Sequence, residues 1–345
     1  MTLLNNSRDT ERPMNSSWQN NIPEVTGLAL NPDGSPMVLH PKGSMILFRI
    51  MRFILMYGVV QVILPSFILR SIYKKNISFQ DIKGIYATVN AAHSSPITKN
   101  STYQNPLLLS RLWKLPSAKI YVSSGALEYQ KREGYCGRTT VRCLLKSFSI
   151  PHNTLPGKSQ HNMVWFEIRV YIRSSTFTHT LCFILKHMNK DAGTDASPET
   201  FCKSMQNAAN SNKTKPLLKT QIIRGDVTYM EFVNIIRKTL DNPNFRLAVN
   251  YLRGPLFGFQ RPKWMPMHIM HGMLIGHFSP IVGILERDEA TDDPLVAIFD
   301  VNHNYGGAYL VPATKLYESI RAMDVFSMKH RALILAEVKK GGGGW

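Results

Sequence analysis

Two apolar runs near the C-terminal end of the sequence constrain the fold of this chain more than any other feature. They cover residues 278–285 and 295–301, and the acidic turn ERDEATDD separates them. Apolar runs joined by a short polar turn predict a β-hairpin. In an antiparallel pair, the start of one strand faces the end of the other. The pattern therefore predicts that His277, just ahead of the first run, lies near Asp300, in the second.

The remaining secondary structure is predicted from apolar spacing and from capping residues. Apolar positions predict a helix at 137–148, and Thr228 can cap another helix at 229–240. The polar stretch 188–216 predicts a loop or an insertion. Further expected elements are strands at 245–252 and 332–338, a helix at 313–322, and strands or short helices at 165–172 and 180–185. Together these elements predict an α+β domain over residues 119–340.

The N-terminal third has a different character from the rest of the chain. Residues 1–44 are rich in Asn, Ser, Pro and Thr, a composition that predicts a flexible tail, and residues 71–118 are expected to be a linker and lead-in. Between them, residues 45–70 include an uncharged apolar run at 53–69. As a helix that run would extend about 25 Å, slightly less than a bilayer core of roughly 30 Å.

We favour a single transmembrane or membrane-associated helix at 45–70 over the alternative, a buried or amphipathic helix. Basic residues flank the segment on both sides, so its orientation in a membrane stays open. The rest of the chain is expected in the cytoplasm.

Charge and cysteine content narrow the class of function. The 41 Lys and Arg residues against 23 acidic residues give a formal charge of +18, which favours an anionic partner. The basic residues are scattered and lack a nucleic-acid-binding motif, so we do not expect a nucleic-acid partner. The four cysteines form no CxxC pair, so neither a zinc site nor a disulfide framework is indicated. Such a set suits a reduced chain with one working thiol.

Cys136 is the candidate for that thiol, because it lies at the start of a predicted helix. A helix N-terminus stabilises a thiolate through its dipole and its free N–H groups, and Arg138 could lower the thiol pKa further. Gly137 would leave room for a substrate beside the sulfur. Gln130 lies six residues earlier, where papain-like enzymes place an oxyanion-binding glutamine. The alternative is an ordinary buried helix cysteine.

His277 and Asp300 complete a possible catalytic set. A nucleophilic cysteine needs a nearby imidazole as base and later as acid. Asp300 would then fix the tautomer of the histidine ring, as the third member of a triad does. Asn302 points to the same face two residues later and is the alternative orienting residue. Asp300 could also be a solvated residue that follows a strand.

Three stretches of the sequence resemble the phytochelatin synthase family. EGYCGRTTVRCLLKSFSI resembles the family's nucleophile segment, FRLAVNYLRG followed by GHFSPIVGI resembles its histidine segment, and FDVNHNYGGAYLVPATKLYESIRAMD resembles its aspartate strand and following helix. Order and rough spacing agree from about residue 121 to residue 338. Without a Cys-rich C-terminal region, the chain resembles the short bacterial-type members.

The resemblance assigns roles to residues of this chain. It implies Cys136 as nucleophile, His277 as base, Asp300 as orienting residue and Gln130 as oxyanion donor. It also implies that Arg331 holds a substrate carboxylate, with Gly137 and Asn250 in the substrate site. The implied fold is papain-like, with the nucleophile helix packed on an antiparallel sheet.

The activity implied by the resemblance is cleavage of the Cys–Gly bond of glutathione or another γ-glutamyl thiol peptide. The γ-glutamylcysteinyl group would form a thioester on Cys136 and pass to water or to a second glutathione. The acyl transfer needs no cofactor. A heavy-metal ion (Cd, Zn or Cu) would act as an activator or as the thiolate complex of the substrate. The alternatives are a membrane-tethered papain-like peptidase that acts on other peptides and a catalytically inactive membrane-bound binding module.

A segment rich in methionine and histidine precedes His277. Thioether and imidazole groups are ligands of soft metal ions, which makes a metal site possible at Met267, His268, Met270 and His271. The alternatives are a flap over the substrate cleft and a patch that rests on the membrane, because methionine adapts to irregular apolar surfaces.

Overall fold

The structure is a computed structural model that describes most of the chain from residue 78 to residue 338. The described residues are 73, 78–92, 97, 100–130, 135–150, 197–210, 218–256, 276–287, 293–302, 307–324 and 327–338. The helices are α4 (Phe79–Ala92), α5 (Pro106–Leu112), α6 (Pro116–Ser123), α7 (Cys136–Ser147), α10 (Pro198–Asn210), α11 (Tyr229–Leu240), α12 (Arg253–Leu256) and α14 (Ala313–Arg321). The strands are β1 (Leu218–Arg224), β2 (Phe245–Leu252), β3 (Gly276–Leu285), β4 (Leu295–Phe299), β5 (Ala308–Pro312), β6 (Met323–Asp324), β7 (Lys329–His330) and β8 (Ala332–Val338).

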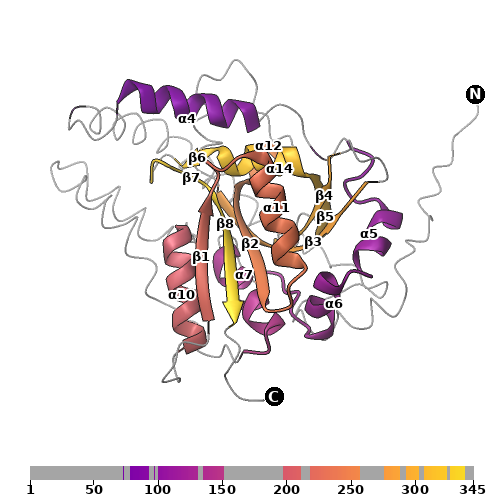
Figure 1. Cartoon of the computed structure of the whole chain (residues 1–345). Helices are drawn as coiled ribbons and strands as arrows, with labels where there is room; N and C mark the ends of the chain where they lie inside the picture. Colours follow the sequence, from indigo (N-terminus) through magenta and orange to yellow (C-terminus); the bar gives the residue numbers. More distant parts are fainter. Residues whose placement is uncertain are drawn as a thin grey trace, which may run out of the picture.

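An antiparallel sheet organises these elements (Figure 1). Its strand order is β1-β8-β2-β3-β4-β5, and every neighbouring pair is antiparallel. The predicted hairpin is confirmed, because β3 pairs with β4 and Ile281 lies opposite Ile298. The register shifts between Ile281 and Gly283, a bulge that bends the pair on its way to the site.

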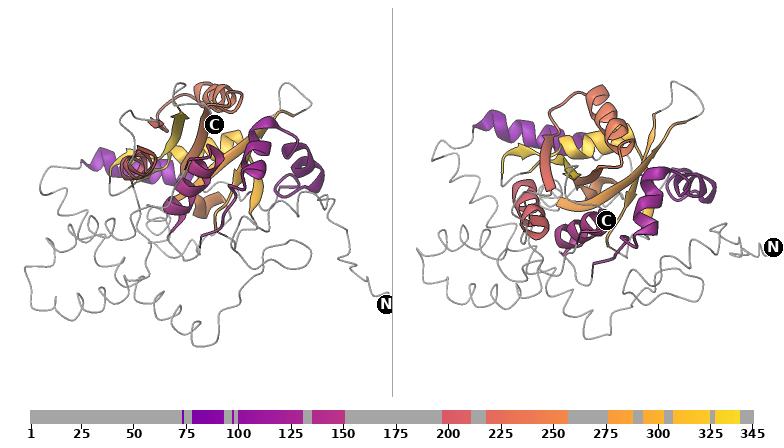
Figure 2. Two further views of the ribbon diagram at one scale, coloured as in Figure 1. Left: turned by 90° about the horizontal axis from the view of Figure 1, so that it is seen from below. Right: turned by 60° about the horizontal axis from the view of Figure 1, so that its bottom comes forward.

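Helices cover both faces of the sheet, so the molecule has three layers (Figure 2). On one face, α5, α6, α7 and α10 enclose a core that includes Phe278, Val282 and Ala297 from the sheet. On the other face, α11 and α14 enclose a core that includes Tyr251, Ile281, Ile298 and Tyr309. Because successive residues of a strand point to opposite faces, the same strands supply both cores.

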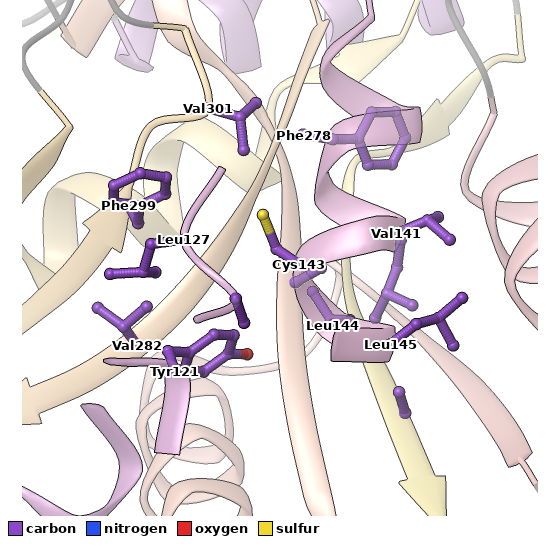
Figure 3. Close-up of a cluster of buried hydrophobic side chains, with 14 of the residues drawn as sticks. Tyr121, Leu127, Val141, Cys143, Leu144, Leu145, Phe278, Val282, Phe299 and Val301 are labelled. Carbon is purple, nitrogen blue, oxygen red and sulfur yellow. The ribbon is translucent and has the colours of Figure 1, made fainter. Parts of the chain in front are cut away.

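The helix α7 is held between the sheet and the segment that follows α6. Leu144, Leu145 and Val141 are buried, and Cys143 points toward the side of the core formed by Leu127 (Figure 3). At the last turn of α7, the buried Arg246 guanidinium donates to the Ser147 backbone oxygen and to Ser147 Oγ, both at 2.9 Å. A cation that binds the final carbonyls of a helix stabilises it.

Most of the predicted elements are confirmed, and the α+β class is confirmed with them. The strands β2 and β8 and the helix α11 have the predicted bounds, and the Thr228 side chain accepts a hydrogen bond from the Glu231 backbone in a capping box. The helices α7 and α14 differ from their predicted bounds by one residue. The regions 165–172 and 180–185 lie outside the described residues.

Two sequence interpretations differ from the structure. The stretch 188–216, expected as a loop or insertion, contains α10, whose buried Phe201, Met205 and Ala208 recur at helical spacing. The stretch 71–118, expected as a linker and lead-in, contains α4, α5 and the start of α6, and Leu109 and Leu112 are buried in the core. In the second stretch, Pro106 and Pro116 are the first residues of α5 and α6, a helix position where proline is well tolerated.

The expected tail at 1–44 and the expected membrane helix at 45–70 lie outside the described residues, and both stay predictions. Among the helices that the structure describes, none combines the length and the apolar character needed to cross a membrane.

Gly225, directly after β1, allows the sheet to approach α14 closely. A methyl group at Gly225 would overlap the backbone carbonyl of Ile320, which cannot move away as a side chain could. At Gly84 in α4, the nearest atom to such a methyl group is Met323 Sδ at 3.9 Å.

We therefore expect Gly225→Ala to lower the free energy of unfolding by about 1–3 kcal/mol, since overpacking strains a rigid contact. Gly84→Ala is the matched control and should raise it by up to about 1 kcal/mol, because alanine favours a helix more than glycine does. Denaturant unfolding of both variants checks the prediction. Equal destabilisation by the two changes would contradict it.

Candidate active site

Cys136 is the first residue of α7, as the sequence predicted. No side chain caps this helix end, and the Tyr135 backbone oxygen accepts the hydrogen bond from Thr139 N at 2.9 Å. The positive end of the helix dipole therefore lies at Cys136. Thr140 Oγ1 donates to the Phe278 backbone oxygen at 3.1 Å, which fastens α7 to β3 one residue from His277.

His277 and Asp300 are in contact, as the hairpin predicted. His277 is the second residue of β3 and Asp300 directly follows β4. The His277 Nε2 atom lies 2.8 Å from Asp300 Oδ1. The Asn302 backbone N–H also donates to Oδ1 at 2.8 Å, so Asn302 supports the carboxylate with its main chain. Since Nε2 faces Asp300, Nδ1 is the ring nitrogen left for Cys136.

The surroundings of Cys136 favour the thiolate. Burial raises the pKa of the Cys136 thiol. The charge of His277 and a hydrogen bond with His277 lower this pKa. A backbone hydrogen bond from Phe278 and the charge of Arg253 lower it further, and together these effects outweigh the burial. The pKa of Cys136 therefore lies below that of an ordinary thiol. A thiolate is the nucleophilic form of cysteine.

The charges of His277 and Asp300 stabilise each other. Burial lowers the pKa of His277, but the Asp300 carboxylate raises it, and the resulting pKa of His277 lies above the ordinary value. Burial raises the pKa of Asp300, but the charge of His277 and its hydrogen bond lower it and prevail. The three groups thus favour a thiolate, an imidazolium and a carboxylate in one row.

The pKa values of the other described cysteines are shifted in the opposite direction. Burial raises the pKa of Cys143 to about 12, and burial also raises the pKa of Cys202. Both pack in the core as apolar side chains. Cys182 lies outside the described residues. Of the three described thiols, only Cys136 has a pKa shifted toward the reactive form.

Gln130 is tied to the same part of the fold. Its backbone N–H donates to the oxygen of Val301, the residue after Asp300, at 2.6 Å. The side chain is buried, and its Oε1 atom accepts no hydrogen bond from the residues that the structure describes. The main chain of Gln130 is therefore held beside the residues that follow β4, and its side-chain amide is buried.

Arg331 lies beside the histidine strand, with Asn250 close by. A methyl group at Gly276 would overlap Arg331 Nη1 and would lie 3.6 Å from Asn250 Nδ2. Gly276 directly precedes His277, and Asn250 pairs with Phe278 across β2 and β3. Both side chains are buried. Glycine at position 276 thus makes room for a buried cation and an amide next to the histidine.

Arg253 is a residue of the site that sequence reasoning missed. It follows β2 directly, and its Nη1 atom lies 3.2 Å from His277 Nε2 and 3.5 Å from Asp300 Oδ1. Arg253 lies in the FRLAVNYLRG stretch, directly after β2, and β2 pairs with β3, the strand that carries His277. This position in the sequence could have identified Arg253 as a site residue. Tyr251 and Tyr309, whose hydroxyls approach Asp300, were also missed.

The predicted metal ligands Met267, His268, Met270 and His271 lie outside the described residues, so that site stays a prediction. Within the described ranges, no group of three or more His, Cys, Asp or Glu side chains could hold a metal ion.

The chain matches a known protein family. The family model described as Phytochelatin synthase matches residues 92–333, well over half of the chain. The matched range includes every site residue discussed above. Among curated proteins, no sequence matches the chain.

The lowered pKa of Cys136 has a testable consequence. Because its pKa lies below the ordinary value while those of Cys143 and Cys202 lie above it, Cys136 should have the largest thiolate fraction of the three at pH 7. We expect iodoacetamide to label Cys136 at least about tenfold faster than the other two, since each pKa unit changes the thiolate fraction about tenfold. Peptide mass spectrometry measures the labelling of each cysteine.

The matched control for this labelling is His277→Ala, which removes the imidazolium and leaves the burial. Labelling of Cys136 should then fall toward the rates of Cys143 and Cys202. Fast labelling of Cys136 that persists in His277→Ala would show that His277 does not activate the thiol.

Proposed function

The chain belongs to the phytochelatin synthase family, and we propose that it cleaves the Cys–Gly bond of glutathione through a γ-glutamylcysteinyl thioester on Cys136. The observation that supports this most strongly is the row formed by Cys136, His277 and Asp300, with the pKa of the thiol lowered. We also propose that the fold is papain-like, since α7 carries the nucleophile and packs on the antiparallel sheet that carries the base.

In the first step, the Cys136 thiolate attacks the carbonyl carbon of the glutathione cysteine. The oxyanion that forms is stabilised by the backbone N–H of Cys136 at the helix N-terminus and by the Gln130 side-chain amide. The His277 imidazolium gives its proton to the nitrogen of the departing glycine. Asp300 holds the ring in place and stabilises its positive charge before the transfer.

In the second step, the thioester passes its acyl group to an acceptor. Either water or the α-amino nitrogen of a second glutathione attacks the thioester carbonyl, and neutral His277 takes the proton that this nucleophile loses. The Cys136 thiolate leaves, and the imidazolium and thiolate are restored. Water gives γ-glutamylcysteine, and a second glutathione gives a phytochelatin. Heavy-metal ions would enter as thiolate complexes of the substrate.

Arg331 is the proposed partner of the α-carboxylate of the γ-glutamyl group. A guanidinium binds a carboxylate through two parallel hydrogen bonds, and burial strengthens that pairing. Asn250 lies beside it as a neutral donor, and Gly137 leaves space for the substrate next to the sulfur. An arginine here would favour glutathione over peptides that lack a free α-carboxylate at this position.

Glutathione treatment tests the covalent step. We expect wild-type protein to gain the mass of a γ-glutamylcysteinyl group on the Cys136 peptide and to release glycine. Cys136→Ser should do neither, because a serine hydroxyl beside this histidine is far less ionised than the thiol. Mass spectrometry and glycine analysis measure both, and the product, γ-glutamylcysteine or a phytochelatin, separates hydrolysis from transfer in runs with and without Cd²⁺.

Cys202→Ser is the matched control for the covalent step and should keep the adduct and the glycine release. An adduct that survives in Cys136→Ser would exclude Cys136 as the nucleophile.

The carboxylate assignment predicts a change in discrimination at Arg331. Wild-type protein should prefer glutathione over its γ-glutamyl α-carboxamide by about tenfold to one-hundredfold in kcat/KM, because a charge-assisted hydrogen bond contributes about 1.5–3 kcal/mol. Arg331→Gln should lose most of that preference. If Arg331→Gln kept the full preference at unchanged melting temperature, the α-carboxylate would bind elsewhere.

A further inference from the structure

The two oxygens of the Asp300 carboxylate have different partners. Oδ1 faces His277 Nε2 and the Asn302 backbone N–H, each at 2.8 Å. The hydroxyl oxygens of Tyr251 and Tyr309 each lie 3.4 Å from Oδ2, within reach of a hydrogen bond. All three side chains are fully buried. Among the residues that the structure describes, Tyr251 and Tyr309 are therefore the side chains that can donate to Oδ2.

The strand register explains why both tyrosines reach the same carboxylate. Tyr251 lies directly opposite His277 across β2 and β3, and its ring meets the imidazole edge-on with centroids 5.7 Å apart. Tyr309 in β5 lies opposite Ile298 in β4, and Ile298 precedes Asp300 by two residues. Cross-strand partners, and residues two apart in a strand, share one face of a sheet. The strands on either side of the hairpin each contribute a hydroxyl.

The two hydroxyl oxygens lie 2.7 Å apart, which is a short hydrogen-bond distance. Two hydroxyl protons serve these three contacts, so when one proton bridges the two tyrosine oxygens, the other can be directed to Oδ2. If either hydroxyl is removed, the other no longer has that partner and can donate to Oδ2 itself. The two tyrosines thus supply one hydrogen bond to Oδ2, and either of them can supply it when the other hydroxyl is absent.

We propose that Tyr251 and Tyr309 are positioning residues that act as one redundant donor to Asp300. They hold the carboxylate so that Oδ1 stays on His277, and they keep it ionised in a site without exposure to water. This inference rests on the role proposed above for Asp300 in orienting His277 and goes beyond it.

The effect on reactivity passes through three coupled groups. A hydrogen bond to a carboxylate favours its charged form, so loss of both hydroxyls raises the pKa of Asp300. A weaker negative charge lowers the pKa of His277, and the pKa of Cys136 then rises. The other ionisable groups that face the row are Arg253 from α12, Tyr129 from the segment before α7, and Arg331 beside Gly276. None of these changes in the variants below.

The test measures the pH dependence of Cys136 alkylation in the full chain, for Tyr251→Phe, Tyr309→Phe and the double variant. Each single variant should keep its labelling rate within about threefold of wild type across the pH range, because one donor remains. The double variant should lose about tenfold in rate at neutral pH as the profile moves about one unit higher, since one pKa unit is a tenfold change in thiolate fraction.

Tyr229→Phe is the matched control, because it removes another hydroxyl–carboxylate hydrogen bond, the one from Tyr229 to Asp293 at 2.6 Å. Its alkylation profile should match wild type. A double-variant profile that coincides with wild type, or a single variant that shows the full shift, would overturn the proposal. Thermal melting of every variant separates loss of folding from loss of positioning.

A second experiment repeats the double substitution in an Asp300→Asn background. Because the tyrosines act through the carboxylate, the two phenylalanines should change the alkylation rate of the Asp300→Asn protein by less than about twofold. Substitutions of groups that share a partner are expected to be non-additive in this way. A further tenfold loss would show that they act on His277 directly. Alkylation needs no glutathione, so this result stands apart from the glutathione test of the proposed function.

Discussion

The contact between the His277 imidazole and the buried Asp300 carboxylate is the interaction on which the rest of the site depends. It forms because β3 and β4 pair as an antiparallel hairpin, which brings the start of one strand to the end of the other. A carboxylate buried this deeply is stable only if donors surround it. The Asn302 backbone, His277 and the two tyrosine hydroxyls meet that need, so the surrounding strands are arranged around this one charge.

The helix α7 brings the thiol to this pair with its own electrostatic preference. Its N-terminus favours the Cys136 thiolate, while the buried Arg246 binds the carbonyls at its C-terminus. The core fixes the helix on the sheet, and the hydrogen bond from Thr140 to Phe278 sets its position beside the histidine. Cys143, on the same helix, shows the effect of burial without the imidazolium, because its pKa rises to about 12.

Cationic groups dominate the wider surroundings of the thiol. Arg253 touches the His277–Asp300 pair, and Arg331 lies against the residue before His277. Their charges suit a substrate with free carboxylates, which accords with the family to which the chain belongs and with the excess of basic residues in the sequence. The proposed acyl transfer and the proposed selection of an anionic peptide would then take place in one compact region of the sheet.

The sequence by itself determined the hairpin, the cysteine at a helix start, and the strands and helices whose apolar period is regular, such as β2, α11 and β8. These follow from local spacing, which a chain carries before it folds. It did not reveal α4 and α10, because their buried stripes are narrow among polar residues, nor α5, because seven residues are too few for a helical period to show. Only the tertiary structure decided that Arg253, Tyr251 and Tyr309 meet at His277 and Asp300. Such contacts join strands far apart in the chain, and strand order and register, rather than any local pattern, bring them together.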